Sequence, residues 1–107
     1  MEKETEQKIS QLQLFEQSLQ NLLIQKQQFQ LQLAEIDSAL KELETTDKTY
    51  KIVGNIMVLA KKEDLKKDLN EKKEVIELRI KSMEKQEIQI KEKTSKLQEE
   101  VLKKIKQ

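Results

Sequence analysis

Apolar residues in the first part of the chain recur at steps of three and four. With Leu12 at heptad position a and Phe15 at position d, both columns continue for more than four repeats. The a column holds Leu12, Leu19, Leu33 and Leu40, the d column holds Phe15, Leu22, Phe29, Ile36 and Leu43, and Lys26 is the one polar residue within this run. A sustained heptad pattern of this kind is typical of a coiled coil, and it predicts a helix over residues 3–44.

The last part of the chain repeats the pattern more weakly. Leu69, Ile76, Met83, Ile90 and Leu97 are spaced by seven and form a d column. The a column that goes with them is Lys73, Ile80, Glu87, Thr94 and Val101, of which only Ile80 and Val101 are apolar. A helix over residues 62–105 with so narrow an apolar stripe is poorly stable alone, so we expect it to pack on a partner helix.

The first helix is the expected partner, in an antiparallel arrangement. Folding the chain back on itself pairs a positions with d positions in every layer: Leu40 with Leu69, Leu33 with Ile76, Phe29 with Ile80, Leu19 with Ile90, and Leu12 with Leu97. Two adjacent layers each contain one polar residue: Lys26 lies opposite Met83, and Glu87 lies opposite Leu22. We therefore predict that Lys26 and Glu87 pair across the seam and set its register.

The block TYKIVGNIMVLA, residues 49–60, interrupts the heptads. It contains two runs rich in β-branched residues around Gly54-Asn55, which predicts a β-hairpin with a primed two-residue turn. The second strand is apolar on both faces, which a solvated hairpin does not need, so we expect other chains to cover it. The expected assembly residues are Tyr50, Ile52, Val53, Gly54, Ile56, Met57, Val58 and Leu59. A connecting loop is the alternative, although such a loop favours polar residues, Gly and Pro.

Composition narrows the possible functions. Hydrophobic residues make up 36% of the 107 residues and charged residues 38%, with one Gly and no Pro, which is typical of long helices. The chain has no Cys and no His, so disulfides, the usual zinc sites and imidazole catalysis are excluded, and we expect no enzyme, metal or cofactor. The 21 basic and 20 acidic residues are mixed along the helices, which does not favour nucleic-acid binding. No segment resembles a signal peptide or a membrane span, and we expect a soluble, cytoplasmic protein.

The hairpin and the helix after it resemble the β-class subunit of prefoldin, a hexameric co-chaperone. The resemblance is carried by Tyr50, Ile52, Val53, Gly54, Ile56, Met57 and Val58, followed by LKKDLNEKKEVIELRIKSMEKQE. It implies a single domain over residues 1–107 of the α+β class, mostly α: an antiparallel two-helix coiled coil with one β-hairpin that assembles with others into a multi-subunit β-barrel body. It also implies a hexamer of two α-class and four β-class subunits. Such complexes hold unfolded proteins at the coiled-coil tips without ATP and pass them to a group II chaperonin.

The tips of this chain carry apolar residues that suit such a role. The expected client-binding residues are Ile9, Leu12, Leu14, Phe15, Val101, Leu102 and Ile105, of which Ile9, Leu14, Leu102 and Ile105 lie off the seam, where we expect a two-stranded coiled coil to leave them exposed. Ordinary surface apolar residues are the alternative. Other off-seam residues, including Leu23, Ile24 and Leu31, fit either a neighbouring subunit or a wider seam. Lys103, Lys104 and Lys106 suit either chaperonin docking or the helix dipole.

A structural or tethering coiled coil in another multiprotein assembly is the rival function. Such a protein needs the two helices and the seam between them. It does not need an apolar hairpin, and the hairpin therefore separates the two hypotheses.

Overall fold

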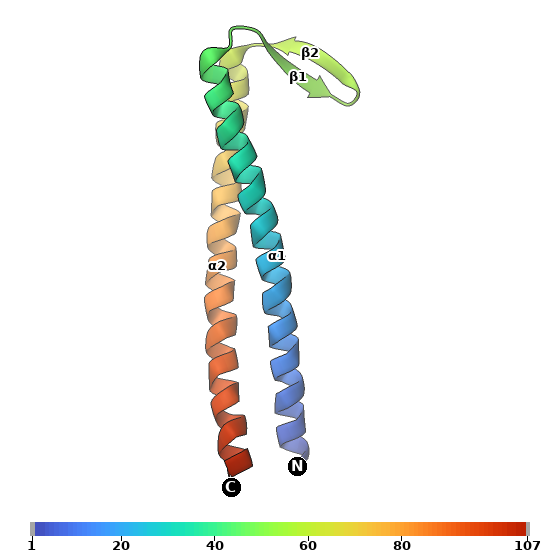
Figure 1. Cartoon of the computed structure of the whole chain (residues 1–107), viewed down its shortest axis with the longest axis vertical. Helices are drawn as coiled ribbons and strands as arrows, with labels where there is room; N and C mark the ends of the chain where they lie inside the picture. Colours follow the sequence, from blue (N-terminus) through green and yellow to red (C-terminus); the bar gives the residue numbers. More distant parts are fainter. Residues whose placement is uncertain (1, 107) are drawn as a thin grey trace. The chain divides into compact units, whose positions relative to one another are not determined.

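The computed structural model describes residues 2–106 and contains two helices and two strands. Helix α1 spans Lys3–Thr45, strand β1 Thr49–Val53, strand β2 Ile56–Ala60 and helix α2 Lys62–Lys106 (Figure 1). The predicted fold class, two long helices joined by a β-hairpin, is confirmed. Each helix ends one residue later than the sequence predicted.

The chain forms two compact units, and both helices contribute to both. The terminal unit contains residues up to Gln27 and from Lys81 onward, and the hairpin unit spans Gln28–Ile80. Within each unit, a segment of α1 runs antiparallel to a segment of α2 (Figure 1). The expectation of a single domain stays a prediction.

The helix ends follow from local chemistry. Glu63 and Asp64 lie in the first turn of α2, where carboxylates interact favourably with the positive end of the helix dipole. Lys103, Lys104 and Lys106 lie in its last turn, where cations are favoured for the same reason. At the end of α1, the Thr45 hydroxyl donates a hydrogen bond to the carbonyl of Glu42 at 3.2 Å, which satisfies one of the last helical acceptors.

The seam between the helices is the core of each unit. The buried apolar side chains, Leu22, Leu43, Ile76, Ile80 and Val101, all lie in the a and d columns that the sequence defined. Thr5, one heptad before Leu12, is also buried, at 3% exposure, so the seam begins earlier than the apolar pattern indicated. Among residues 2–106 no side chain is completely buried, because two helices cover only one stripe of each other.

The hairpin continues the pairing of the helices that flank it. Leu40 and Leu69 face each other in the seam. Nine residues from each of them toward the hairpin lie Thr49 and Ala60, which are the first Cα partners of the antiparallel ladder. Their pairing is reinforced by Thr49, whose buried hydroxyl donates a 2.6 Å hydrogen bond to the Ala60 carbonyl. The ladder closes at Val53 and Ile56 around Gly54-Asn55.

The turn uses the one glycine of the chain for its backbone conformation. Gly54 has φ of 61°, in the left-handed region, and no other described residue has a positive φ. A single positive φ at the first central position is the requirement of a type II′ turn, in which Gly is preferred at that position. The predicted primed turn is therefore present, and it fixes the register of the two strands.

Candidate assembly and client-binding surfaces

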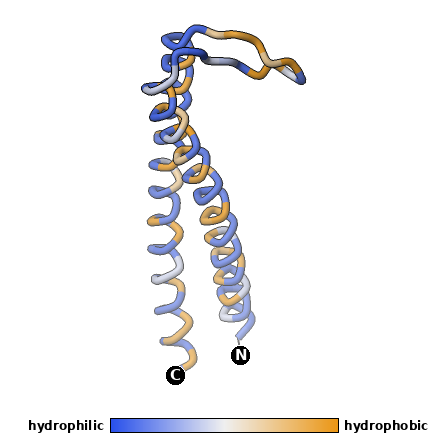
Figure 2. Tube along the Cα trace, turned by 45° about the horizontal axis from the view of Figure 1, so that its top comes forward, coloured by the Kyte–Doolittle hydropathy of each residue, from blue (hydrophilic) through white to orange (hydrophobic). Residues whose placement is uncertain are grey.

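The hairpin carries exposed apolar side chains on both faces. Cross-strand pairing places Tyr50, Ile52, Met57 and Leu59 on one face and Val53, Ile56 and Val58 on the other. All seven are exposed, from 41% for Val58 to 72% for Leu59. Figure 2 shows β2 hydrophobic along its length and β1 hydrophobic at its end near the turn. Within residues 2–106 the sheet has only these two strands, so each strand also has one unpaired edge. Such a surface is suited to assembly with other strands.

An open groove lies between β1 and the two helices of the hairpin unit. Its apolar wall is formed by Phe29, Ile36, Ala39, Ile52, Leu65, Leu69, Val75 and Ile76. Its polar lining includes Lys51, Asp68, Lys72 and Arg79, and the Arg79 guanidinium lies 5.6 Å from the centre of the Phe29 ring. Ile52 lines this groove and is 70% exposed, so apolar surface extends from the hairpin onto the helices.

Polar residues in the seam make ion pairs between the helices. Lys26 Nζ lies 3.8 Å from Glu87 Oε2, which is the pair that the two adjacent layers with polar residues suggested, and also 3.8 Å from Glu84 Oε1. The side chains of Lys26 and Glu87 are 19% and 15% exposed, so both charges are largely removed from water. A largely desolvated pair of this kind discriminates against other registers more than it adds stability. Its role in setting the register stays a prediction.

Removing one or both charges of the Lys26–Glu87 pair tests whether this pair adds stability. We expect Lys26→Gln to lower the free energy of unfolding by about 1 kcal/mol, because Glu87 then keeps its charge in the seam without the ammonium beside it. We expect Lys26→Leu with Glu87→Leu to raise it by about 1–3 kcal/mol, because apolar side chains then fill the seam. The measurement is urea unfolding at a fixed subunit concentration. Lys85→Gln, at an exposed position of α2, is the control, and a double variant less stable than the native chain contradicts the prediction.

A second seam lysine forms the corresponding contact in the hairpin unit. Lys73 Nζ, at an a position of α2, lies 2.9 Å from Asp37 Oδ1 on α1. The hydrogen bond and the negative charge of Asp37 raise the pKa of Lys73 above its usual value. Each unit thus contains a lysine in the seam that is neutralised by the other helix. The sequence analysis identified the Lys26–Glu87 pair but not Asp37, because Asp37 lies at an e position, outside the a and d columns.

The predicted tip residues differ in exposure. Leu14, Leu102 and Ile105 are 62%, 54% and 59% exposed, as expected for off-seam positions. Ile9 is less exposed than expected, because its side chain is half-buried, although it does not belong to the core. Its e position flanks the seam, where the opposite helix shields part of the side chain. Val101 is buried at 7%, and Leu12 and Phe15 are half-buried, which makes these three primarily seam residues.

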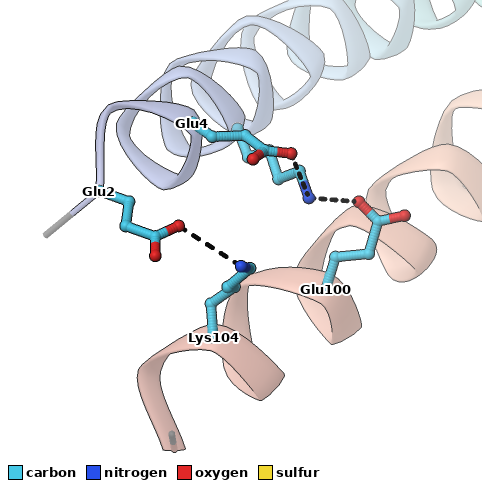
Figure 3. A network of polar contacts seen from close by, with 5 residues as sticks. Glu2, Glu4, Glu100 and Lys104 are labelled. Atoms are coloured by element: carbon cyan, nitrogen blue, oxygen red, sulfur yellow. Dashed lines mark hydrogen bonds and ion pairs between the residues drawn. The ribbon is translucent and has the colours of Figure 1, made fainter.

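Ion pairs connect the two helices at the tip. Lys8 Nζ lies 3.2 Å from Glu100 Oε2 on α2 and 3.8 Å from Glu4 Oε1 on α1, and Lys104 Nζ lies 3.4 Å from Glu2 Oε2 (Figure 3). The glutamates of these pairs are exposed to solvent, so each pair contributes little to stability. They do define which sides of the two helices meet. Of the basic residues near the C-terminus, Lys104 is engaged in an ion pair within the chain.

The sequence analysis missed one exposed apolar residue in the terminal unit. Ile88 is 56% exposed on α2, beside the seam residue Glu87. Listing every apolar residue outside the a and d columns would have identified it.

Across the described part of the chain, neither helix is long and apolar enough to cross a membrane.

The fold and its surfaces place the chain among two-helix coiled-coil proteins that carry an apolar β-hairpin between the helices. Comparison with known proteins gives the family. A family model described as prefoldin subunit matches residues 6–107. The chain therefore belongs to the prefoldin subunit family, a family of chaperones rather than enzymes, and the resemblance seen in its sequence is confirmed.

Individual relatives are beta subunits. Prefoldin subunit beta of Archaeoglobus fulgidus is 41% identical over 96 residues, which cover 87% of this chain and 83% of the relative. Prefoldin subunit beta of Methanospirillum hungatei is 38% identical and covers 87% and 80% of the two chains. The crystal structure of the prefoldin beta subunit from Thermococcus strain KS-1 matches with a TM-score of 0.87 and 34% identity, covering 94% of this chain and 90% of that one.

Proposed function

We propose that this chain is the β-class subunit of an ATP-independent holdase that acts in the cytoplasm. In this proposal, hairpins of several chains join into a β-barrel body, in a hexamer of two α-class and four β-class prefoldin subunits. The coiled-coil tips hold non-native polypeptides and deliver them to a group II chaperonin. The proposal fits a family whose members are chaperone subunits.

The observation that supports it most directly is the location of exposed apolar surface. One set of exposed apolar side chains lies on the hairpin, and another lies in the terminal unit at Leu14, Leu102 and Ile105. A tethering coiled coil requires the seam but neither of these surfaces. Two separate apolar surfaces suit a protein that assembles through one and holds unfolded chains through the other.

Aggregation of an unfolded protein tests the holdase activity. The chain is assembled with an α-class prefoldin subunit, a chemically denatured client is diluted into it, and light scattering is followed over time. We expect stoichiometric suppression of scattering without nucleotide, because capture uses apolar contact alone. We also expect added ATP to change nothing and an added group II chaperonin to release the client. Scattering equal to that of the client alone, or suppression that needs ATP, contradicts the proposal.

A further inference from the structure

The large apolar residues outside the seam of the terminal unit are unevenly distributed around the coiled coil. They are Ile9, Leu14, Leu23, Ile24, Ile88, Leu102 and Ile105. With the heptads defined above, Ile9, Leu23 and Ile105 occupy e positions, and Ile88 and Leu102 occupy b positions. Only Leu14, at c, and Ile24, at f, lie elsewhere. In each helix the b and e positions lie on the same side of the seam, because they are three residues apart in the heptad.

The ion pairs at the tip show that these positions face the same way on both helices. Lys8 contacts Glu4 on α1 and Glu100 on α2, and both glutamates occupy g positions, so the g positions of the two helices meet on one side (Figure 3). The e positions flank the seam on its other side. The b and e residues of α1 and α2 therefore form a common surface in the terminal unit, which we call the b/e side.

The b/e side carries two apolar points. The first comprises Ile9, Leu102 and Ile105, near the chain ends, and the second comprises Leu23 and Ile88, which are 39% and 56% exposed. Ile9 and Leu23 lie two heptads apart, which corresponds to about 21 Å along the helix. An extended polypeptide covers this distance with about six residues.

The surface between the two points carries no net charge. Exposed polar residues line it: Gln13, Gln20, Ser95 and Gln98, with Glu16 and Lys91 as one residue of each sign. Amide side chains both donate and accept hydrogen bonds, so they match the backbone of an extended chain. On the opposite side of the terminal unit, the c and g positions of α2 carry a net positive charge, from Lys93, Lys96, Glu100 and Lys103, whereas the c and g positions of α1 from Gln7 to Gln25 carry no charge.

We propose that the b/e side binds one extended, uncharged segment of a non-native polypeptide at both apolar points. The inference rests on the holdase function proposed above and adds to it a second contact, at Leu23 and Ile88, and a class of client segment. Apolar side chains of the segment contact the two points, and its backbone pairs with the amides between them. A highly charged segment loses hydration on this surface and finds only Glu16 and Lys91 as partner charges, which disfavours it.

Labelled peptides test the second point. Three uncharged peptides are compared by fluorescence anisotropy on the assembled complex: one with a single Leu-Ile pair, one with two pairs separated by six Gln or Ser residues, and one with two pairs separated by two. We expect the widely spaced peptide to bind about tenfold tighter than the other two, because only it reaches both points. In Leu23→Ser with Ile88→Ser, we expect this advantage to disappear while the affinity of the single-pair peptide is unchanged.

The matched control is Leu31→Ser with Leu78→Ser. These leucines are 62% and 67% exposed, lie one on each helix, and occupy f positions in the hairpin unit, so the advantage should remain. A Leu23/Ile88 variant that keeps the advantage overturns the inference and leaves the holdase function standing. A loss of particle mass in this variant also overturns it, because the surface is then a contact between copies. If no peptide binds the unaltered complex, both proposals fail.

Discussion

Ile52→Lys is expected to leave the helices folded but to weaken assembly by about 100-fold. Ile52 is 70% exposed in the isolated chain and lies opposite Met57 in the ladder, so a lysine there meets no charge within its own hairpin. In the assembled body proposed above, another strand covers this position, and an ammonium there would lose its hydration without a partner. A cost of a few kcal/mol for such a group corresponds to the expected change.

At Val58, the sign of the introduced charge matters, because Lys51 lies across the ladder. Val58 lies directly opposite Lys51, so Val58→Lys places like charges across the ladder and destabilises the hairpin itself. Val58→Glu avoids this repulsion and should prevent assembly as effectively as Ile52→Lys. Ile52→Lys and Val58→Glu introduce opposite charges. If both prevent assembly, the cause is the burial of a charge on the hairpin surface and not the sign of that charge.

Light scattering with an α-class partner measures the particle mass, and circular dichroism confirms the helices. Leu31→Lys is the control, since Leu31 is 62% exposed on α1 at an f position. It should assemble normally. Unchanged mass for both Ile52→Lys and Val58→Glu would show that the hairpin is not the assembly element.

Replacing the exposed tip residues is expected to remove most of the holdase activity. Leu14→Ser, Leu102→Ser and Ile105→Ser together should raise the amount of complex needed for half-maximal suppression by about tenfold or more, since each residue offers about 1 kcal/mol or more of apolar contact. Ile9 is left unchanged in this variant because it is half-buried. Val101 is left unchanged because its side chain belongs to the seam.

Assembly and stability are the controls for the tip variant. Its particle mass and its unfolding midpoint in urea should match those of the native complex, because the three side chains are already exposed. The Leu31→Ser, Leu78→Ser double variant should suppress aggregation like the native complex. Suppression that survives in the tip variant would mean that clients bind elsewhere.

The elements of this fold were predictable because their signals are local. The heptad columns around Leu12 and Leu69 placed both helices, and the β-branched runs around Gly54 placed the hairpin. The antiparallel register followed from matching a with d positions. The polar pair predicted from that matching, Lys26 and Glu87, is present, with its charged atoms 3.8 Å apart.

The candidate surfaces were less predictable. Ile9 was expected to be exposed and is half-covered, and Ile88 was not considered although it is exposed. The partners of Lys8 and Lys73, Glu100 and Asp37, were also missed. The exposure of Ile9 and the contacts of Glu100 and Asp37 depend on the positions that flank the seam, where the length and direction of side chains from the other helix decide the outcome.

The amino-acid sequence by itself determined the helices, the turn, the seam and the apolar character of the hairpin, because each depends on residue periodicity or on the conformational preference of single residues. The tertiary structure decided which off-seam residues share a side of the coiled coil and which seam charges are neutralised. That outcome requires the two helices to be placed side by side, since a single helix carries no information about which of its flanks the partner will cover.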